Sequence, residues 1–152
     1  MSGDSAARSV SNTVPIAEGL FTWPSNDPRL LGSKCSNCGV VTFPAQNSCA
    51  ACSGTETESV ELARRGTLWT FTLQCFLPNR PPYDGPETPE TFVPFGVGYI
   101  ELPDQTRVQA RIKTADVSKL KVGMEMELVV EKYIERDGKD VVSYFFTPVD
   151  EL

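Results

Sequence analysis

The stretch CSNCGVVTFPAQNSCAAC, residues 35–52, holds four of the five cysteines in this 152-residue chain. They form two CxxC pairs, Cys35 with Cys38 and Cys49 with Cys52. Each pair has the length of a tight turn that points two sulfurs at one ion. Ten residues separate the pairs, which is enough for a short hairpin that brings both turns together. The sequence therefore predicts a small metal-binding ribbon.

Four thiolates favour zinc among the common cytosolic ions, and they fill its tetrahedral coordination. No position then remains for water or substrate, so the predicted zinc site is structural rather than catalytic. Gly39 follows the first turn, and Ser53 and Gly54 follow the second, where glycine permits a positive φ. A rubredoxin-like iron site uses the same four ligands and stays open as an alternative. A thioredoxin-type redox pair is disfavoured, because neither CxxC lies in a βαβ pattern.

The chain contains no histidine, and this absence limits its chemistry. It excludes Ser-His-Asp and Cys-His catalysis, histidine general bases and every zinc site that uses imidazole. Carboxylates, lysines and tyrosines remain, but none lies in a spacing that indicates a catalytic site. The fifth cysteine, Cys75, stands alone in a strand-like run and is expected to be a small core residue. We therefore expect no catalytic residues.

Composition and charge narrow the class of protein. The net charge is −6, from 14 basic and 20 acidic residues, and no basic stripe typical of a nucleic-acid-binding protein is visible. The hydrophobic fraction of 40% is enough for a core, but the apolar runs are too short to span a bilayer. The first ten residues, MSGDSAARSV, lack the apolar segment of a secretory signal. These features predict a cytoplasmic protein, with reduced cysteines.

The chain divides into three parts by composition. Residues 1–13 are small and polar, which predicts a disordered tail. Residues 14–55 are expected to hold an N-terminal helical segment, interrupted by prolines, and then the ribbon. Residues 56–152 have the pattern of β-strands. The expected fold is mostly β: an N-terminal helical segment, a rubredoxin-like zinc ribbon and a five-stranded OB-fold barrel.

The order of elements after the ribbon is the basis for the OB-fold prediction. A short helix, with Thr114 or Asp116 as its cap, is expected between the third and fourth strands. Asp137-Gly138 predicts a hairpin turn between the last two. Residues 77–94 carry six of the twelve prolines and join the first two strands in a long loop. A loop of this length either has a docking or ligand-covering role or is simply exposed to solvent, and both alternatives stay open. The five strands are expected at residues 66–76, 92–102, 106–112, 124–130 and 141–146.

The chain resembles the acyl-CoA-associated zinc-ribbon/OB-fold family, which was formerly described as a family of unknown function. The pattern L-x-G-x-x-C-x-x-C-G-x-x-x-F-P runs from Leu30 to Pro44, and the second CxxC and the barrel follow it. The resemblance covers about residues 14–148, with further matches in the barrel. These are Gly66-Thr67, residues 98–102, residues 120–124 and Phe146-Thr147-Pro148.

The resemblance implies a non-catalytic, zinc-containing accessory subunit of a thiolase-superfamily enzyme, such as benzoylsuccinyl-CoA thiolase or a sterol side-chain aldolase. The partner would carry the catalytic residues, and the small subunit would support it and help to enclose the acyl-CoA. The implied assembly is a hetero-oligomer without nucleic acid or membrane, and nucleic-acid binding is the alternative function. Six residues are candidate contacts with the partner or with CoA: Phe43, Trp69, Tyr83, Arg64, Arg65 and Arg80. For the arginines, surface salt bridges are the competing role.

Overall fold

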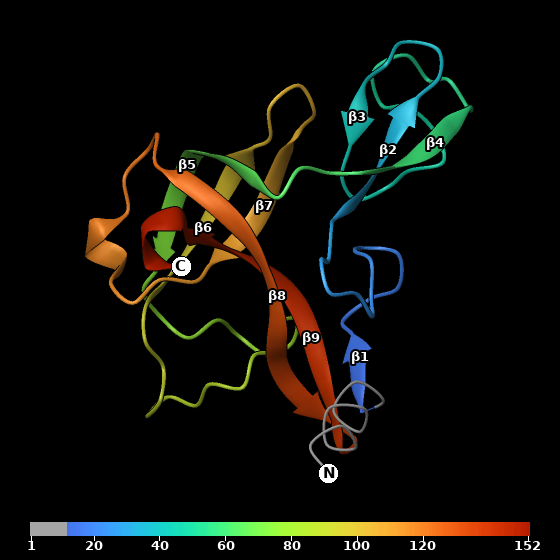
Figure 1. Ribbon diagram of the computed structural model, residues 1–152. Helices are drawn as coiled ribbons and strands as arrows, with labels where there is room; N and C mark the ends of the chain where they lie inside the picture. Colours follow the sequence, from blue (N-terminus) through green and yellow to red (C-terminus); the bar gives the residue numbers. More distant parts are fainter. Residues whose placement is uncertain (1–11) are drawn as a thin grey trace.

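The computed structural model describes residues 12–152, which form two sheets (Figure 1). The smaller sheet has the strand order β3-β2-β4 and contains the ribbon, whereas the larger has the order β1-β9-β7-β6-β5-β8. A further pairing of β9 with β8 closes the larger sheet into a barrel of five strands, β5 to β9. The strands are β1 (Thr13–Pro15), β2 (Leu31–Cys35), β3 (Val41–Thr42), β4 (Thr57–Glu61), β5 (Arg65–Gln74), β6 (Phe95–Glu101), β7 (Arg107–Ile112), β8 (Glu125–Arg136) and β9 (Lys139–Pro148).

The barrel follows the period of two that a half-buried strand requires. In β7, Val108, Ala110 and Ile112 are buried, while the alternating Arg107 and Gln109 are exposed. The pairing of β7 with β9 is parallel and all other pairings between barrel strands are antiparallel. The predicted order of five strands in an OB-fold is thus confirmed. The largest side chains sealed inside the barrel are Leu68, Ile100, Leu102, Val108, Met126, Leu128 and Phe146.

The connections after the third barrel strand also agree with the sequence. A 3-10 helix, Val117–Lys119, lies between β7 and β8, and the Asp116 carboxylate caps it by accepting a hydrogen bond from the Ser118 N–H at 3.0 Å. Asp137 and Gly138 form the hairpin turn with φ of 53° and 74°. This left-handed conformation suits the right-handed twist of the strands that it joins.

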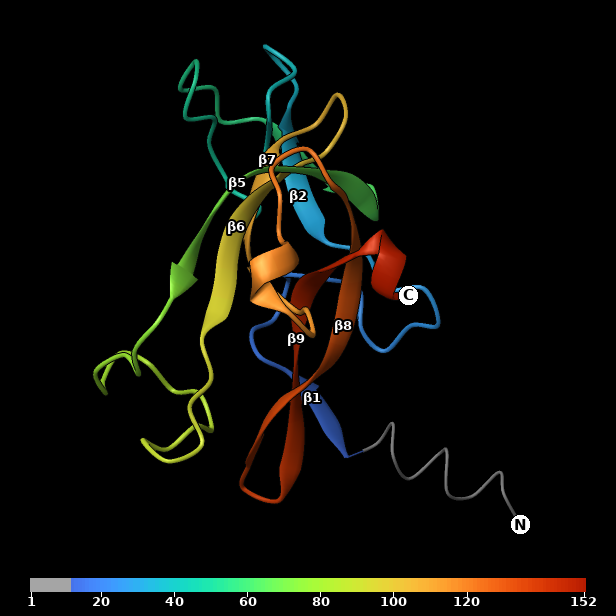
Figure 2. The same ribbon diagram turned by 90° about the vertical axis from the view of Figure 1, so that its left-hand side faces the viewer.

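The β8–β9 hairpin is longer than predicted, and its outer half projects below the barrel (Figure 2). The sequence predicted a fourth strand of residues 124–130, whereas β8 continues to Arg136. Charged residues such as Glu131, Lys132 and Glu135 fill this part of β8, because a projecting two-stranded ribbon is exposed to water. Because this part of β8 lacks the alternation of apolar and polar residues, the sequence pattern predicted a strand that ends too early.

The predicted N-terminal helical segment is wrong, because residues 12–152 contain no α-helix. β1 pairs in parallel with β9, and Phe21 forms an isolated bridge with Leu30. Gly19 has φ +81°, a left-handed conformation that ends helical geometry, and Pro24 and Pro28 lack the N–H that a helix interior needs. Residues 1–11, most of the predicted disordered tail, lie outside the described part of the chain, and Thr13 begins β1.

The ribbon and the barrel share one apolar core. Leu30 and Leu62 flank the ribbon sheet, and both have no exposed surface. They belong to the same buried cluster as the barrel residues Leu68 and Phe146. The position of the ribbon on the barrel is therefore fixed by burial as well as by the chain. Within the described residues, no helix has the length and apolar character needed to cross a membrane.

Candidate functional site

The four ribbon cysteines meet at one point. The Sγ atoms of Cys35 and Cys52 lie 3.6 Å apart, and those of Cys38 and Cys49 lie 3.5 Å apart. All four sulfurs lie within 4.8 Å of one another. A tetrahedral zinc with Zn–S bonds of about 2.3 Å places its sulfurs about 3.8 Å apart. The four sulfurs are therefore positioned to bind one metal ion with the geometry that zinc prefers.

Two tight turns create this arrangement. The Gly39 N–H donates to the Cys35 carbonyl, and the Ser53 N–H donates to the Cys49 carbonyl, each at 2.9 Å. Gly39 and Ser53 have φ of 78° and 63°, so Ser53, rather than the neighbouring Gly54, takes the left-handed conformation in the second turn. Gly54 serves a different purpose, because a Cβ at this position would lie 3.2 Å from the Cys52 sulfur.

Polar groups next to Cys52 favour the thiolate form that a metal requires. The Asn37 side-chain amide donates to the Cys52 sulfur at 3.5 Å. With the backbone N–H of Gly54, it lowers the pKa of the Cys52 thiol from 9.0 to about 6. Several thiolates this close repel one another, and a divalent cation offsets that repulsion. Asn37 was not among the predicted site residues, although its place inside the first CxxC is a signal that could have indicated it.

Cys75 lies apart from the metal cluster. It follows the end of β5 and is exposed, so the prediction that it is a small core residue is wrong. Its thiol donates a weak hydrogen bond to the Leu73 carbonyl at 3.8 Å. The strand-like sequence pattern continues past Gln74, but the regular pairing with β6 ends there, and Cys75 is left outside the barrel.

Replacement of a single ribbon cysteine is expected to abolish metal binding. Cys49→Ser removes one of four ligands and leaves an incomplete tetrahedron, whereas the matched control Cys75→Ser should retain one metal ion per chain. Elemental analysis of the purified variants measures both. Equal metal content in Cys49→Ser and the wild-type chain would contradict the assignment.

The two aromatic candidates for partner contact have different surroundings. Phe43 is half-buried and stands edge-on to Tyr144, with ring centroids 5.5 Å apart, so it joins the ribbon to the β8–β9 hairpin. Trp69 is 46% exposed on the outer face of β5, where Tyr99 lies edge-on to it at 6.3 Å. The Arg107 guanidinium lies over the Trp69 ring at 3.9 Å. Contact with a partner stays a prediction for both, and only Trp69 presents much free surface.

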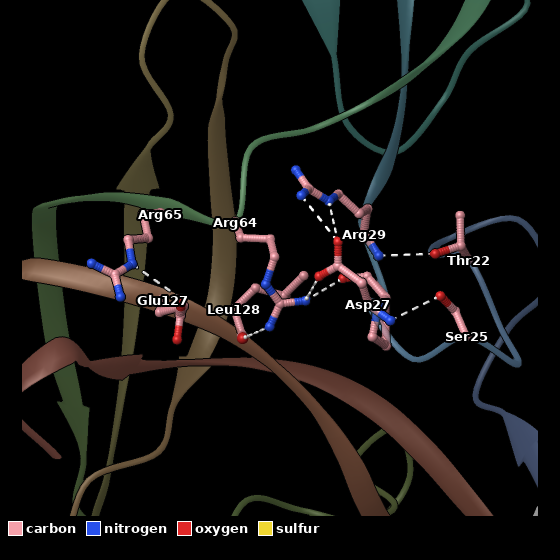
Figure 3. A network of polar contacts seen from close by, with 9 residues as sticks. Thr22, Ser25, Asp27, Arg29, Arg64, Arg65, Glu127 and Leu128 are labelled. Atoms are coloured by element: carbon pink, nitrogen blue, oxygen red, sulfur yellow. Dashed lines mark hydrogen bonds and ion pairs between the residues drawn. The ribbon is translucent and has the colours of Figure 1, made fainter. Parts of the chain in front are cut away.

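Arg64 and Arg65 are adjacent in sequence but have different roles (Figure 3). Arg64 donates to the carbonyls of Pro28 at 2.5 Å and Leu128 at 2.9 Å, and pairs with Asp27 at 3.2 Å. It therefore joins the segment before the ribbon to β8. Arg65 points the other way and forms an exposed ion pair with the Glu127 carboxylate at 3.0 Å.

We expect Arg64→Ala to destabilise the fold far more than Arg65→Ala. The first variant leaves two carbonyls without their charged donor, which costs about 2–4 kcal/mol of the free energy of unfolding. The second removes an exposed ion pair and leaves the stability close to that of the wild-type chain. Denaturant unfolding at a saturating metal concentration measures the difference, and equal stability of the two variants would refute the bridging role of Arg64.

Arg80 and Tyr83 belong to the long loop and help to fold it onto the barrel. Arg80 donates to the carbonyls of Gly85, at 2.6 Å, and Glu87, both within the loop. The Tyr83 phenol donates to the Glu87 carboxylate at 2.7 Å. Arg111 on β7 pairs with that carboxylate at 2.9 Å and donates to the Tyr83 oxygen at 3.2 Å. The loop is therefore anchored by a residue that the sequence did not single out.

The charges of this anchor are mutually stabilising. Burial acts to raise the pKa of the Glu87 carboxyl, but hydrogen bonds from Tyr83 and Arg111 outweigh it and hold the pKa below the usual 4.5. Burial and the hydrogen bond to Glu87 raise the pKa of the Tyr83 phenol above its usual range. Because the carboxyl pKa is lowered, its contribution is present above pH 4.5 and is lost as the pH falls through the folded-state pKa.

Removal of the anchor should free the loop. Arg111→Ala is expected to speed chymotrypsin cleavage after Tyr83 or Phe92 several-fold, because local opening of the loop then costs less free energy. Arg107→Ala, on the same strand and face, is the control and should leave the rate unchanged. The wild-type loop should also open when the pH drops below 4.5. Resistance of Arg111→Ala equal to that of the control would overturn this account.

A groove of about 520 Å³ lies between the ribbon, the outer face of β6 and β7, and the β8–β9 hairpin. It brings together two predicted contact residues, Phe43 and Tyr83, whereas Arg64, Arg65 and Arg80 lie elsewhere. Its walls are largely aromatic, with Arg107 and Arg111 as cations. The aromatic residues that line it are Phe43, Tyr83, Phe95, Tyr99, Tyr133 and Tyr144.

Comparison with known proteins identifies both parts of the chain. A family model described as "ChsH2, rubredoxin-like zinc ribbon domain" matches residues 25–58. A second, described as "ChsH2, C-terminal OB-fold domain", matches residues 59–131. Among solved structures, the Ltp2-ChsH2(DUF35) aldolase aligns with a TM-score of 0.57 at 21% identity, over 79% of this chain and 84% of that one. This alignment shows that the two chains have the same fold.

Two characterised proteins have clear sequence similarity. The chain is 36% identical over 123 residues to the benzoylsuccinyl-CoA thiolase subunit BbsA of Thauera aromatica, covering 80% of this chain and 78% of that protein. It is 30% identical over 125 residues to a DUF35 domain-containing scaffold protein of Methanocaldococcus jannaschii, covering 80% and 82% respectively. The resemblance predicted from the cysteine pattern and the strand order is confirmed.

Proposed function

Because the chain belongs to the DUF35 family, with the zinc-ribbon and OB-fold domains of ChsH2, we propose that it is a non-catalytic accessory subunit of a thiolase-superfamily enzyme. The observation that carries this proposal is the 36% identity with a subunit of benzoylsuccinyl-CoA thiolase. The chain's own chemistry supports it, since no histidine is present and the four clustered cysteines leave no open metal position.

The proposed role of the metal is structural, and the proposed metal is Zn²⁺. The ribbon sheet comprises only the short strands β2, β3 and β4, and few of its side chains are buried. Cys35 and Cys49 are buried at its centre, where larger domains place apolar side chains. A core of this size needs an additional cross-link to be stable. A four-thiolate zinc site provides one, because the free energy of metal binding stabilises the folded ribbon. When bound, zinc would contribute this cross-link and no reaction step.

The aromatic groove is the proposed place where the chain helps to enclose an acyl-CoA in the assembled enzyme. Its apolar walls suit an acyl or pantetheine chain, and the partly exposed Arg107 guanidinium suits a phosphate. Of the three arginines first considered, Arg64 and Arg80 are engaged with backbone carbonyls of this chain. Arg65 is exposed and paired only with carboxylates, so it is the more accessible phosphate contact.

Nucleic-acid binding, the alternative function, is not supported by the relatives. The aromatic groove lies on strands that often bind single-stranded nucleic acid in OB-folds. The net charge of −6 opposes such binding, because affinity for nucleic acid depends mainly on neutralising phosphates. Retention of labelled oligonucleotides at low salt would revive this alternative.

Co-expression tests the proposed function. The chain is produced together with thiolase-superfamily subunits, including any that a neighbouring gene encodes, and the purified material is assayed for acyl-CoA cleavage. We expect a stable complex that is active, while the isolated chain has no turnover. The Cys49→Ser variant should fail to support the complex, whereas Cys75→Ser should support it. Absence of a complex with every such subunit, or turnover by the isolated chain, would refute the proposal.

A further inference from the structure

One edge of the barrel is open. β5 pairs with β6 from Thr67 to Gln74, but it pairs with β8 only from Arg65 to Thr67. One more pair of hydrogen bonds follows, from the Leu68 N–H to the Met124 carbonyl at 2.9 Å and from the Gly123 N–H to the Leu68 carbonyl at 2.8 Å. Beyond Leu68 the outer edge of β5 has no strand partner among the described residues. Figure 2 shows β5 leaving β8 and ending at the rim of the barrel.

Beyond Leu68, the backbone along this edge presents N–H and C=O groups that no neighbouring strand pairs. Leu68 directs its N–H and C=O away from β6, and a bulge at Trp69 then adds one residue to β5. In an antiparallel strand, successive residues direct their N–H and C=O groups alternately to the two sides. Past the bulge, this alternation directs the backbone groups of Phe71 and Leu73 to the open side as well. Such groups form a template for one more extended strand.

This open edge lacks the protection seen at the free edges of β1, β3, β4, β7 and β8. Exposed edges are normally blunted by charged residues, by proline or by shortness. β8 carries Glu131, Lys132, Glu135 and Arg136 beyond its pairing with β5, and β7 carries Arg107 and Arg111. β4 carries Glu58 and Glu61, β3 has two residues, and β1 ends in Pro15. The stretch WTFTLQCF, residues 69–76, contains neither a charge nor a proline.

The side chains along this edge are unusually apolar for exposed positions. Trp69, Leu73 and Phe76 have 46%, 38% and 71% of their surface exposed. They account for three of the eight large hydrophobic side chains that are exposed in the described chain, and all lie within eight residues. A chain with a net charge of −6 that keeps one edge uncharged and apolar has a surface suited to being covered.

We propose that the thiolase-superfamily partner docks by adding an extended strand to the open edge of β5 between Trp69 and Phe76. The inference rests on the proposed function and specifies how the two subunits join. Main-chain hydrogen bonds to Phe71 and Leu73 would give affinity, as in other cases of strand addition. The edge selects an uncharged strand rich in β-branched or aromatic residues, because a charged side chain opposite Leu73 would be buried without a partner.

A proline at the open edge tests this mode of docking. In Leu73→Pro the outward N–H is removed, while the ladder to β6 does not use it. Leu73→Ala removes only the side chain, and Leu152→Ala alters the exposed C-terminal residue, which lies on the side of the molecule opposite β5 (Figure 2). Affinity for the co-expressed thiolase-type subunit is measured for all three and for the wild-type chain. Metal content and the thermal unfolding midpoint establish that each variant is folded.

We expect Leu73→Pro to weaken the complex about tenfold more than Leu73→Ala does, and Leu152→Ala to have no effect. Hydrogen exchange of the outward Phe71 and Leu73 N–H groups should be fast in the isolated chain and slow in the complex. If the wild-type complex forms and the Phe71 and Leu73 N–H groups stay unprotected, strand addition is wrong while the proposed function stands. If the isolated chain is a dimer that Leu73→Pro dissociates, a second copy covers the edge and the inference is overturned. If no complex forms at all, both the function and the inference fail.

Discussion

The convergence of four sulfurs on one point is the constraint on which the rest of the structure depends. Like-charged thiolates this close repel one another, so the ribbon requires a cation to hold its two turns together. Once four thiolates surround that cation, no ligand position remains for a substrate or a reactive water. The same contacts that stabilise the ribbon therefore leave no open metal position, which agrees with the proposed role as an accessory subunit.

The ribbon can act on a partner only if its position relative to the barrel is fixed, and three kinds of contact fix it. Leu30 and Leu62 continue the barrel core up to the ribbon sheet. Phe43 packs edge-on against Tyr144. Arg64 donates hydrogen bonds both to the segment before the ribbon and to β8. Apolar, aromatic and polar contacts thus hold the ribbon and the barrel together as one body. The aromatic groove lies between them, and the open edge lies along the second half of β5.

The sequence predicted the elements that depend on local chemistry. The CxxC spacing, the Asp116 cap and the Asp137-Gly138 turn are local, and the structure has all three. Features that depend on distant pairing were missed or wrong: residues 14–29 pair with β9 or turn instead of forming a helix, and Cys75 is exposed because β5 stops at Gln74. Arg111 gave no local signal either, since its partner Glu87 lies 24 residues earlier in the chain.

Native mass spectrometry of the assembly purified from cells that express the chain at its natural level tests the central claim most directly. The account predicts a complex that contains a thiolase-superfamily subunit and one zinc ion per copy of this chain, with the metal retained until the ribbon unfolds. A folded chain that carries no metal, or one that is recovered only alone, would contradict it.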